Sequence, residues 1–236
     1  MHASGGIVST VNDLAKWLKA NINQESEALS EYNVFEYLHN TQVEQNKEYF
    51  TYKRSGYSLG WDIAEYNSEK LLTRFGNYGG YSIHVSFMPK RKLGVIAFTN
   101  QDVAHALPHV IANYAYNSML NKDEKYSLFL LESQRLSKSI DRELAIAPDS
   151  SQLVTENQLS PRLLGTYENN QHWPSKKIFI DNGQAKVTWG NLTGLLLKVD
   201  GEYKIHFGSL QRPLTVINES KPNVEIKNGS LVYRKT

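Results

Sequence analysis

The chain lacks several features that would point to common function classes. It contains no cysteine among its 236 residues, which excludes disulfide bonds and thiolate chemistry. No apolar run approaches the roughly 18 residues of a membrane-spanning helix, so we expect no membrane span. The net charge of +2 is small and no basic stripe is present, so we expect no nucleic-acid partner.

A nucleophile motif is also missing. No Ser-x-x-Lys sequence occurs anywhere in the chain. The opening MHASGGIVST has no charged leader followed by an apolar block, so we expect no signal peptide. It resembles an interior segment behind an added start methionine. We therefore expect the chain to be a fragment of a longer protein.

The first 145 residues alternate between helical and strand patterns. Ser9 or Thr10 can cap a helix whose apolar positions Leu14, Trp17, Leu18 and Ile22 should face a core. The polar run 42–54 predicts a loop. The remaining periodicities predict helices at 31–40, 103–120 and 124–144, and strands at 57–66, 70–76, 80–88 and 93–100. In the last helix, the expected apolar face comprises Tyr126, Phe129, Leu130, Leu136, Ile140 and Leu144.

The last part of the chain has a different pattern. Residues 146–160 are polar without a clear period and are the expected linker. Eight short strand-like runs follow within 161–236, and some are separated by hairpin turn residues such as Asp181-Asn182-Gly183 and Asp200-Gly201. This pattern predicts a small eight-stranded up-and-down β-barrel, which leaves no open strand edges.

Residues 71–100 carry the arrangement that is most informative for function. A predicted strand ends in Arg74, Phe75 and Gly76, and Gly79 and Gly80 allow a sharp turn into the next strand. Acyl transfer by a serine enzyme needs a nucleophile, a base, an oxyanion hole and a cation for the substrate carboxylate. Arg74 could supply the cation and the backbone N–H of Asn77 one oxyanion-hole donor.

Several segments in order resemble the serine β-lactamase-like hydrolases, which include class C β-lactamases, penicillin-binding proteins, D-aminopeptidases and esterases. The resemblance covers about residues 3–121. The segments that carry it are Ala3-Ser4-Gly5-Gly6-Ile7-Val8-Ser9-Thr10, Asp13-Leu14-Ala15-Lys16-Trp17-Leu18, Tyr57-Ser58-Leu59-Gly60-Trp61, Arg74-Phe75-Gly76-Asn77-Tyr78-Gly79-Gly80-Tyr81, Ser86-Phe87-Met88-Pro89 and Leu93-Gly94-Val95 through Thr99-Asn100.

The resemblance implies an α+β fold class. Residues 1–145 would be the C-terminal part of a β-lactamase/transpeptidase-like domain, with an antiparallel sheet and flanking helices. After the linker at 146–160, the eight-stranded barrel at 161–236 looks like the lipocalin-like domain that follows some members. The family also suggests a bacterial, periplasmic or secreted protein.

The family carries Ser-x-x-Lys, then Tyr-x-Asn, then Lys-Thr-Gly or His-x-Gly. Only the third motif has a counterpart here, at Arg74-Phe75-Gly76. The resemblance implies catalytic positions at Arg74, Gly76 and Asn77, and substrate contacts at Arg74, Tyr78 and Gly79. Tyr167-Glu168-Asn169 fits the second motif by pattern alone, but it follows the third motif and lies in the predicted barrel.

Arginine is a departure from the family pattern at the third motif. A guanidinium stays protonated and cannot shuttle protons, but it can hold a carboxylate. The resemblance thus implies a small-molecule or peptide substrate for the parent hydrolase, no cofactor, and no turnover by this chain alone. The nucleophile half would normally cover the strand at 93–100, so we expect an unpaired apolar edge there. A homodimer, a swapped arrangement or an N-terminal partner fragment could cover it.

Other interpretations remain open. The chain could be a non-catalytic binding or regulatory module with the same fold, or a free-standing lipocalin-like carrier. Arg74 could be a solvated charge, and the glycines could serve turns alone. His84 alternates with Ile83 and Val85 and is expected to be structural. His105 and His109 have i, i+4 spacing, but Pro108 lies between them and no third ligand is evident, so we expect no metal site.

Overall fold

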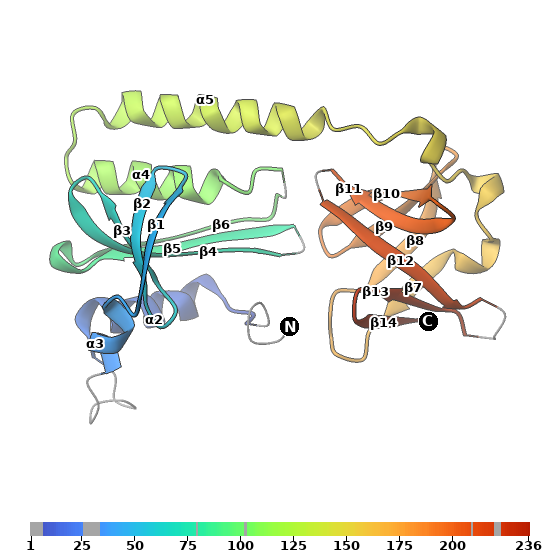
Figure 1. The fold of residues 1–236 in the computed structure, drawn as a ribbon, viewed down its shortest axis with the longest axis horizontal. Helices are drawn as coiled ribbons and strands as arrows, with labels where there is room; N and C mark the ends of the chain where they lie inside the picture. The colour runs from blue at the N-terminus through green and yellow to red at the C-terminus, as the bar shows by residue number, and fades with distance from the viewer. Residues whose placement is uncertain (1–6, 26–33, 79, 102, 209, 220–222) are drawn as a thin grey trace. The chain divides into compact units, whose positions relative to one another are not determined.

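The computed structural model describes residues 7–25, 34–78, 80–101, 103–208, 210–219 and 223–236 (Figure 1). The chain divides into two compact units. The first comprises residues 1–100 and 104–136, and the second comprises 101–103 and 137–236. The two units divide within one long helix, and each is described by itself.

The first unit is built on a six-stranded antiparallel sheet. Its strands follow one another in chain order, from β1 at one edge to β6 at the other. They are β1 Val43–Tyr49, β2 Tyr52–Tyr57, β3 Asp62–Tyr66, β4 Glu69–Tyr78, β5 Tyr81–Met88 and β6 Leu93–Thr99. The strands predicted at 70–76, 80–88 and 93–100 correspond to β4, β5 and β6. The antiparallel sheet with flanking helices predicted from the sequence is therefore confirmed.

Helices cover this sheet. Helix α2 (Val11–Asn23) and helix α4 (Leu107–Met119) both pack on β5 and β6, and the short α3 (Val34–His39) precedes β1. Two separate buried clusters result. One joins Leu18 of α2 to Trp61, Leu72, Val85 and Phe87 of the sheet. The other joins Tyr116 of α4 to Tyr52, Ala64, Leu71 and Met88.

The first helix begins at the cap expected from the sequence. The Thr10 hydroxyl oxygen accepts a hydrogen bond from the Asp13 backbone N–H at 3.2 Å, and it donates one to the Asp13 carboxylate at 2.9 Å. Leu18 is buried as expected. Trp17, which we expected to face the core, is about half exposed, but its ring stacks on Trp61 with centroids 4.8 Å apart. The indole is therefore covered on one side only.

Two predictions in the region 42–66 were wrong. The run 42–54, expected to be a loop, contains strand β1, a turn at Phe50 and Thr51, and the start of β2. Most β1 side chains are exposed, so the strand lacks the alternating apolar pattern by which strands are recognised. The single strand expected at 57–66 is two strands, because a turn containing Gly60 at φ +110° separates β2 from β3.

Helix α5 (Lys125–Leu144) also departs from the expected pattern. Several members of its predicted apolar face are exposed, including Tyr126, Leu130 and Leu144. The buried residue of this helix is instead Glu132. Its carboxylate accepts hydrogen bonds from the Asn113 side chain of α4. This buried polar contact holds α5 against α4, together with the ring contacts of Tyr114 with Tyr126 and Phe129.

The second unit contains a closed eight-stranded barrel, as predicted. Every strand pairs with its neighbours in chain order, and β14 closes the barrel by pairing with β7. The strands are β7 Gly165–Glu168, β8 Lys176–Asp181, β9 Gln184–Trp189, β10 Leu192–Val199, β11 Glu202–Phe207, β12 Leu210–Asn218, β13 Glu225–Asn228 and β14 Leu231–Lys235. Each contributes a fully buried side chain, namely Tyr167, Ile178, Val187, Leu196, Ile205, Leu214, Ile226 and Tyr233.

The segment expected as a linker is attached to the barrel. Residues 146–160 contain two short 3-10 helices, η3 (Ser150–Gln152) and η4 (Glu156–Gln158), and a third, η5 (Pro161–Leu163), leads into β7. The Val154 N–H donates to Leu196 O at 3.0 Å, and Val154 O accepts from Ala185 N–H at 2.8 Å. Val154 is also buried. The polar composition of residues 146–160 gave no sign of this packing. The domain limits 1–145 and 161–236 remain a prediction.

Candidate functional site

The end of strand β4 is open along one side. The pairing of β3 with β4 ends where Asp62 lies opposite Thr73. Beyond that point the residues from Arg74 to Tyr78 pair with β5 alone, and no other described strand pairs with them. Their remaining backbone edge can accept an extended ligand. Gly79, predicted to contact substrate, lies outside the described residues.

Arg74 lies at this open end. Its side chain is 52 % exposed, and its Nη1 lies 3.3 Å from Asp62 Oδ2. The guanidinium carbon also lies 5.4 Å from the centre of the Tyr57 ring. The interpretation of Arg74 as a merely solvated charge therefore does not describe its surroundings, because the side chain is held by a buried carboxylate. More than half of it still faces solvent.

The carboxylate that holds Arg74 belongs to a small polar cluster. Asp62 is 4 % exposed and lies between Arg74 and a second arginine, Arg54, whose Nη1 is 3.4 Å from Asp62 Oδ1. Gln45 donates to the same Oδ1 at 3.1 Å. Sequence reasoning missed this cluster. Its one signal was an acidic residue directly after Gly60-Trp61, at the start of strand β3 and before the apolar pair Ile63-Ala64.

The other predicted positions on β4 have separate surroundings. A Cβ atom added to Gly76 would lie 2.8 Å from the Ile83 side chain, so the strand pair requires a glycine here. Asn77 is exposed, and its side-chain amide donates to the Ser82 hydroxyl at 3.1 Å. Tyr78 is half-buried. The structure therefore places Arg74, Gly76, Asn77 and Tyr78 along one strand end, with Arg74 bonded to Asp62.

A buried serine–histidine pair occurs elsewhere in the same sheet. His84 Nε2 lies 2.6 Å from Ser86 Oγ, which lies 2.9 Å from the Tyr116 hydroxyl. None of the three side chains is exposed to solvent. Burial lowers the pKa of His84 to about 3, with a smaller effect from His109, so the ring is neutral near pH 7. A substrate could not reach this pair, and its role is structural, as expected for His84.

Asn113 of α4 organises a second buried polar cluster. Its side chain accepts from the Tyr52 hydroxyl at 2.7 Å and donates to Glu132 at 2.9 Å and 3.0 Å. It also lies 3.1 Å from His109 Nε2, and burial lowers the pKa of that histidine to about 3. Burial raises the pKa of Glu132. These contacts join α4, α5 and β2, and no pattern in the sequence predicted them.

The two histidines considered for metal binding do not share a helix. Helix α4 begins at Leu107 with Pro108 in its first turn, so His105 lies before it. His109 Nε2 contacts Thr51 Oγ1 at 2.9 Å and Asn113. Among the described residues, no group of three His, Cys, Asp or Glu side chains could hold a metal ion. No described helix has the length and hydrophobicity to cross a membrane.

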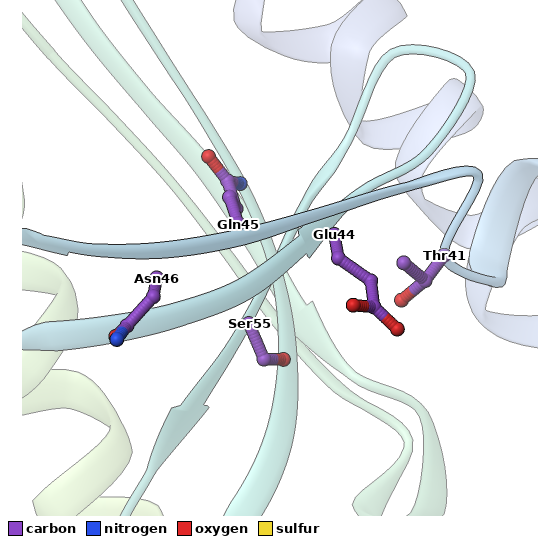
Figure 2. A pocket seen from close by; sticks show the side chains of 5 residues that line it. All are labelled: Thr41, Glu44, Gln45, Asn46 and Ser55. Atoms are coloured by element: carbon purple, nitrogen blue, oxygen red, sulfur yellow. The ribbon is translucent and has the colours of Figure 1, made fainter.

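A polar hollow of about 450 Å³ lies beside the β1–β2 hairpin. Figure 2 shows its lining residues, with Glu44 and Ser55 directed to one side of the hairpin and Gln45 to the other. The register of β1 shifts between Glu44 and Lys47, which marks a β-bulge at this place. Thr41 and Asn46 complete the lining. The hollow was not predicted, and Arg74 does not line it.

One comparison with known proteins matches the first part of the chain. A family model described as Beta-lactamase matches residues 1–115. No curated protein matches the chain.

Solved structures give weaker likenesses. One is the octameric penicillin-binding protein homologue from Pyrococcus abyssi, which is 20 % identical with a TM-score of 0.46 over 96 % of this chain and 47 % of that one. Another is SurE with D-Leu, which is 14 % identical with a TM-score of 0.35 over 97 % of this chain and 50 % of that one. The chain spans about half the length of these proteins.

The family match covers the sheet up to β6 and most of helix α4. It includes the strand that carries Arg74, Gly76 and Asn77. The resemblance noted in the sequence is thereby confirmed for residues 1–115, which match the Beta-lactamase family model.

Proposed function

We propose that this chain forms the C-terminal part of a serine hydrolase site that acts on amide or ester bonds. In this proposal Arg74 holds a substrate carboxylate, the Asn77 backbone N–H contributes to the oxyanion hole, and Tyr78 and Gly79 contact the substrate. The observation that carries it is the open end of β4 from Arg74 to Tyr78, which begins at a half-exposed guanidinium. Strand addition and carboxylate pairing are both available there.

The chain has no Ser-x-x-Lys, so the proposal places the nucleophile on polypeptide outside it. By itself the chain should not turn over substrate. Arg74 remains protonated and cannot act as a general base. Substrate binding and acyl transfer are therefore divided between two parts of the parent protein.

A comparison of the two edge strands of the sheet, β1 and β6, supports the binding of a partner at β6. At the β1 edge, the bulge between Glu44 and Lys47 and the charged side chains disfavour further strand pairing. The β6 edge has neither protection. Its sequence LGVIAFT is uncharged, its register with β5 is regular, and Phe98 is 40 % exposed. We propose that the missing N-terminal half or a second copy of the chain pairs with β6.

A fluorescent penicillin tests the division of the site. We expect the isolated chain neither to be acylated by it nor to hydrolyse nitrocefin. Rapid reaction of the chain alone would overturn the proposal. The genomic sequence before His2 gives an independent check, since an in-frame Ser-x-x-Lys some 200 residues upstream is expected of the family organisation.

A second candidate function is a non-catalytic binding or regulatory module. Two contacts favour it, namely the ion pair of Arg74 with Asp62 and the close packing of Gly76 on Ile83. Each of these two contacts would give its motif residue, Arg74 or Gly76, a role in stabilising the sheet without any catalytic role. A true start codon at the beginning of this chain, with no Ser-x-x-Lys upstream, would favour the module. The barrel could then bind a ligand or shield the cleft in the manner of a lipocalin-like domain.

A further inference from the structure

Asp62 is the one acidic residue that contacts Arg74 in the described part of the chain. It is the first residue of β3 and lies opposite Thr73, the last residue of β4 that pairs with β3. The open edge of β4 begins at the next residue, Arg74. We propose that Asp62 is a positioning residue that fixes the Arg74 guanidinium for recognition of a substrate carboxylate. This inference rests on the proposed function, because that function gives Arg74 its ligand.

The two arginines that contact Asp62, Arg54 and Arg74, differ in how tightly their side chains are held. Arg54 is 14 % exposed, and its guanidinium carbon lies 4.3 Å from the centre of the Tyr49 ring. Stacking and burial therefore fix Arg54, and Arg54 together with Gln45 fixes Asp62 Oδ1. Only Oδ2 is directed to Arg74. The cluster is thus held rigidly from the hairpin side and presents one carboxylate oxygen to the open edge.

The charges of the cluster leave room for an anion. Two guanidinium groups and one carboxylate carry a net charge of +1, and the exposed part of that charge is Arg74. Asp62 engages only Nη1 of Arg74 among the described residues, so the other N–H groups of its planar fork can bind a carboxylate. Without the Asp62 charge, Arg54 would repel Arg74, and Arg74, the more exposed of the two, would turn toward solvent.

Carboxylate binding to the full chain tests this inference. N-acetylglycine is titrated against ¹⁵N-labelled protein while the backbone amides of residues 74–78 are followed by NMR, and N-acetylglycinamide serves as the uncharged control ligand. We expect the wild type to bind the acid and not the amide. R74Q should abolish acid binding, and D62N should weaken it about tenfold, the value of one charge-assisted hydrogen bond. The Arg74 side chain should also become more mobile in D62N without ligand, as measured by NMR relaxation of its Nε–Hε group.

Two further variants keep the test decisive. D181N removes an ion pair in the barrel, between Asp181 Oδ2 and Lys186 Nζ, and should leave acid binding unchanged. If D62N does not fold, R74K replaces it: lysine keeps the charge but lacks the fork, so acid binding should again fall about tenfold. Wild-type affinity in D62N, or in R74K, would overturn the role of Asp62 while carboxylate binding by the site stands. A wild type that binds the amide as well as the acid, or neither, would overturn carboxylate recognition and the proposed function with it.

Discussion

Every strand of the barrel pairs with two neighbours, whereas β1 and β6 of the six-stranded sheet each pair with one. The barrel closes through β14 and β7, and its interior is filled by one or more buried side chains from each strand. The sheet instead ends in an uncharged, regular strand at β6. Closure removes the need for a partner, while an unprotected edge of this kind favours one. The two units therefore differ in how far their strands satisfy their own hydrogen bonds.

The two units also treat buried polar groups differently. In the sheet, Asp62 has three partners and Asn113 links several side chains. In the barrel, Lys176 is fully buried, and its ammonium nitrogen has no hydrogen-bond partner among the described residues. It lies 4.2 Å from the centre of the Trp189 ring and 5.2 Å from that of Tyr233. These two aromatic rings offset part of the cost of burying the ammonium group.

Core truncations should show whether the units are stabilised separately. Leu72→Ala in the sheet and Leu196→Ala in the barrel each remove a fully buried side chain, and each should cost roughly 3 kcal/mol of unfolding free energy. We expect each variant to speed native-state amide hydrogen exchange only in its own unit, as measured by residue-resolved NMR. Equal loss of protection in both units would show that they unfold together.

Lys176 should make the stability of the barrel depend on pH. Burial lowers its pKa from 10.5 to about 7, with a smaller effect from Arg212. Between these values the unfolded chain binds a proton that the folded chain does not, so stability should rise with pH in this window. Below about pH 7 Lys176 is protonated in both states, so its full cost is present and does not change with pH. The gain is at most about 1.4 kcal/mol per pH unit.

Denaturant unfolding of wild type and Lys176→Met between pH 6 and pH 9.5 measures this contribution. The difference between the two proteins should be largest at pH 6, where it has nearly reached its plateau, and should shrink as the pH rises through 7 toward 9.5. The upper limit of pH 9.5 stays below the ordinary tyrosine pKa of 10.0, because above it the unfolded chain would ionise while Tyr167, whose pKa burial raises to about 12, would not. A difference that does not change with pH would show that Lys176 has an ordinary pKa in the folded barrel.

The edges of the sheet can be compared with one matched pair of substitutions. Phe98→Lys places a charge on β6, and Val43→Lys places one on β1, where 62 % of the valine is exposed. We expect the wild type to self-associate through β6, Phe98→Lys to weaken association about tenfold or more, and Val43→Lys to leave it unchanged. Sedimentation equilibrium measures the constants. A wild type that remains monomeric at high concentration would contradict a second copy as the partner of β6.

Substitutions in the hairpin turns of the barrel should have the smallest effect on the free energy of unfolding. Gly201 adopts φ +84° between β10 and β11, and no atom lies near the place of an added Cβ. Gly201→Ala should therefore cost only about 1 kcal/mol, from backbone conformation alone. Gly201→Asn should cost less, because asparagine tolerates this conformation better. Thermal unfolding compares the two variants, and an equal loss in both would mean that the side chains meet a steric obstacle.

Local patterns in the sequence were sufficient for much of the fold. The alternation in β4, β5 and β6, the cap at Thr10 and the turn residues of the barrel each depend on near neighbours, so the sequence predicted them. The Arg74-Phe75-Gly76 motif was found in the same way. The failures were at β1, where an exposed edge strand has no apolar period, and at α5, where Glu132 is buried in place of apolar residues.

Composition and order along the chain by themselves determined the barrel, the resemblance of the first part of the chain to the Beta-lactamase family model, and the position of the arginine on its strand. Only the tertiary structure decided what the arginine touches, because strand pairing brings Asp62 of β3 beside Arg74 and Arg54 of β2 beside Asp62. The tertiary structure also decided that β4 extends beyond its pairing with β3 and that β6 is an edge strand of the described sheet. Contacts of this kind depend on strand register, and register is a property of two strands together, which a single stretch of sequence does not encode.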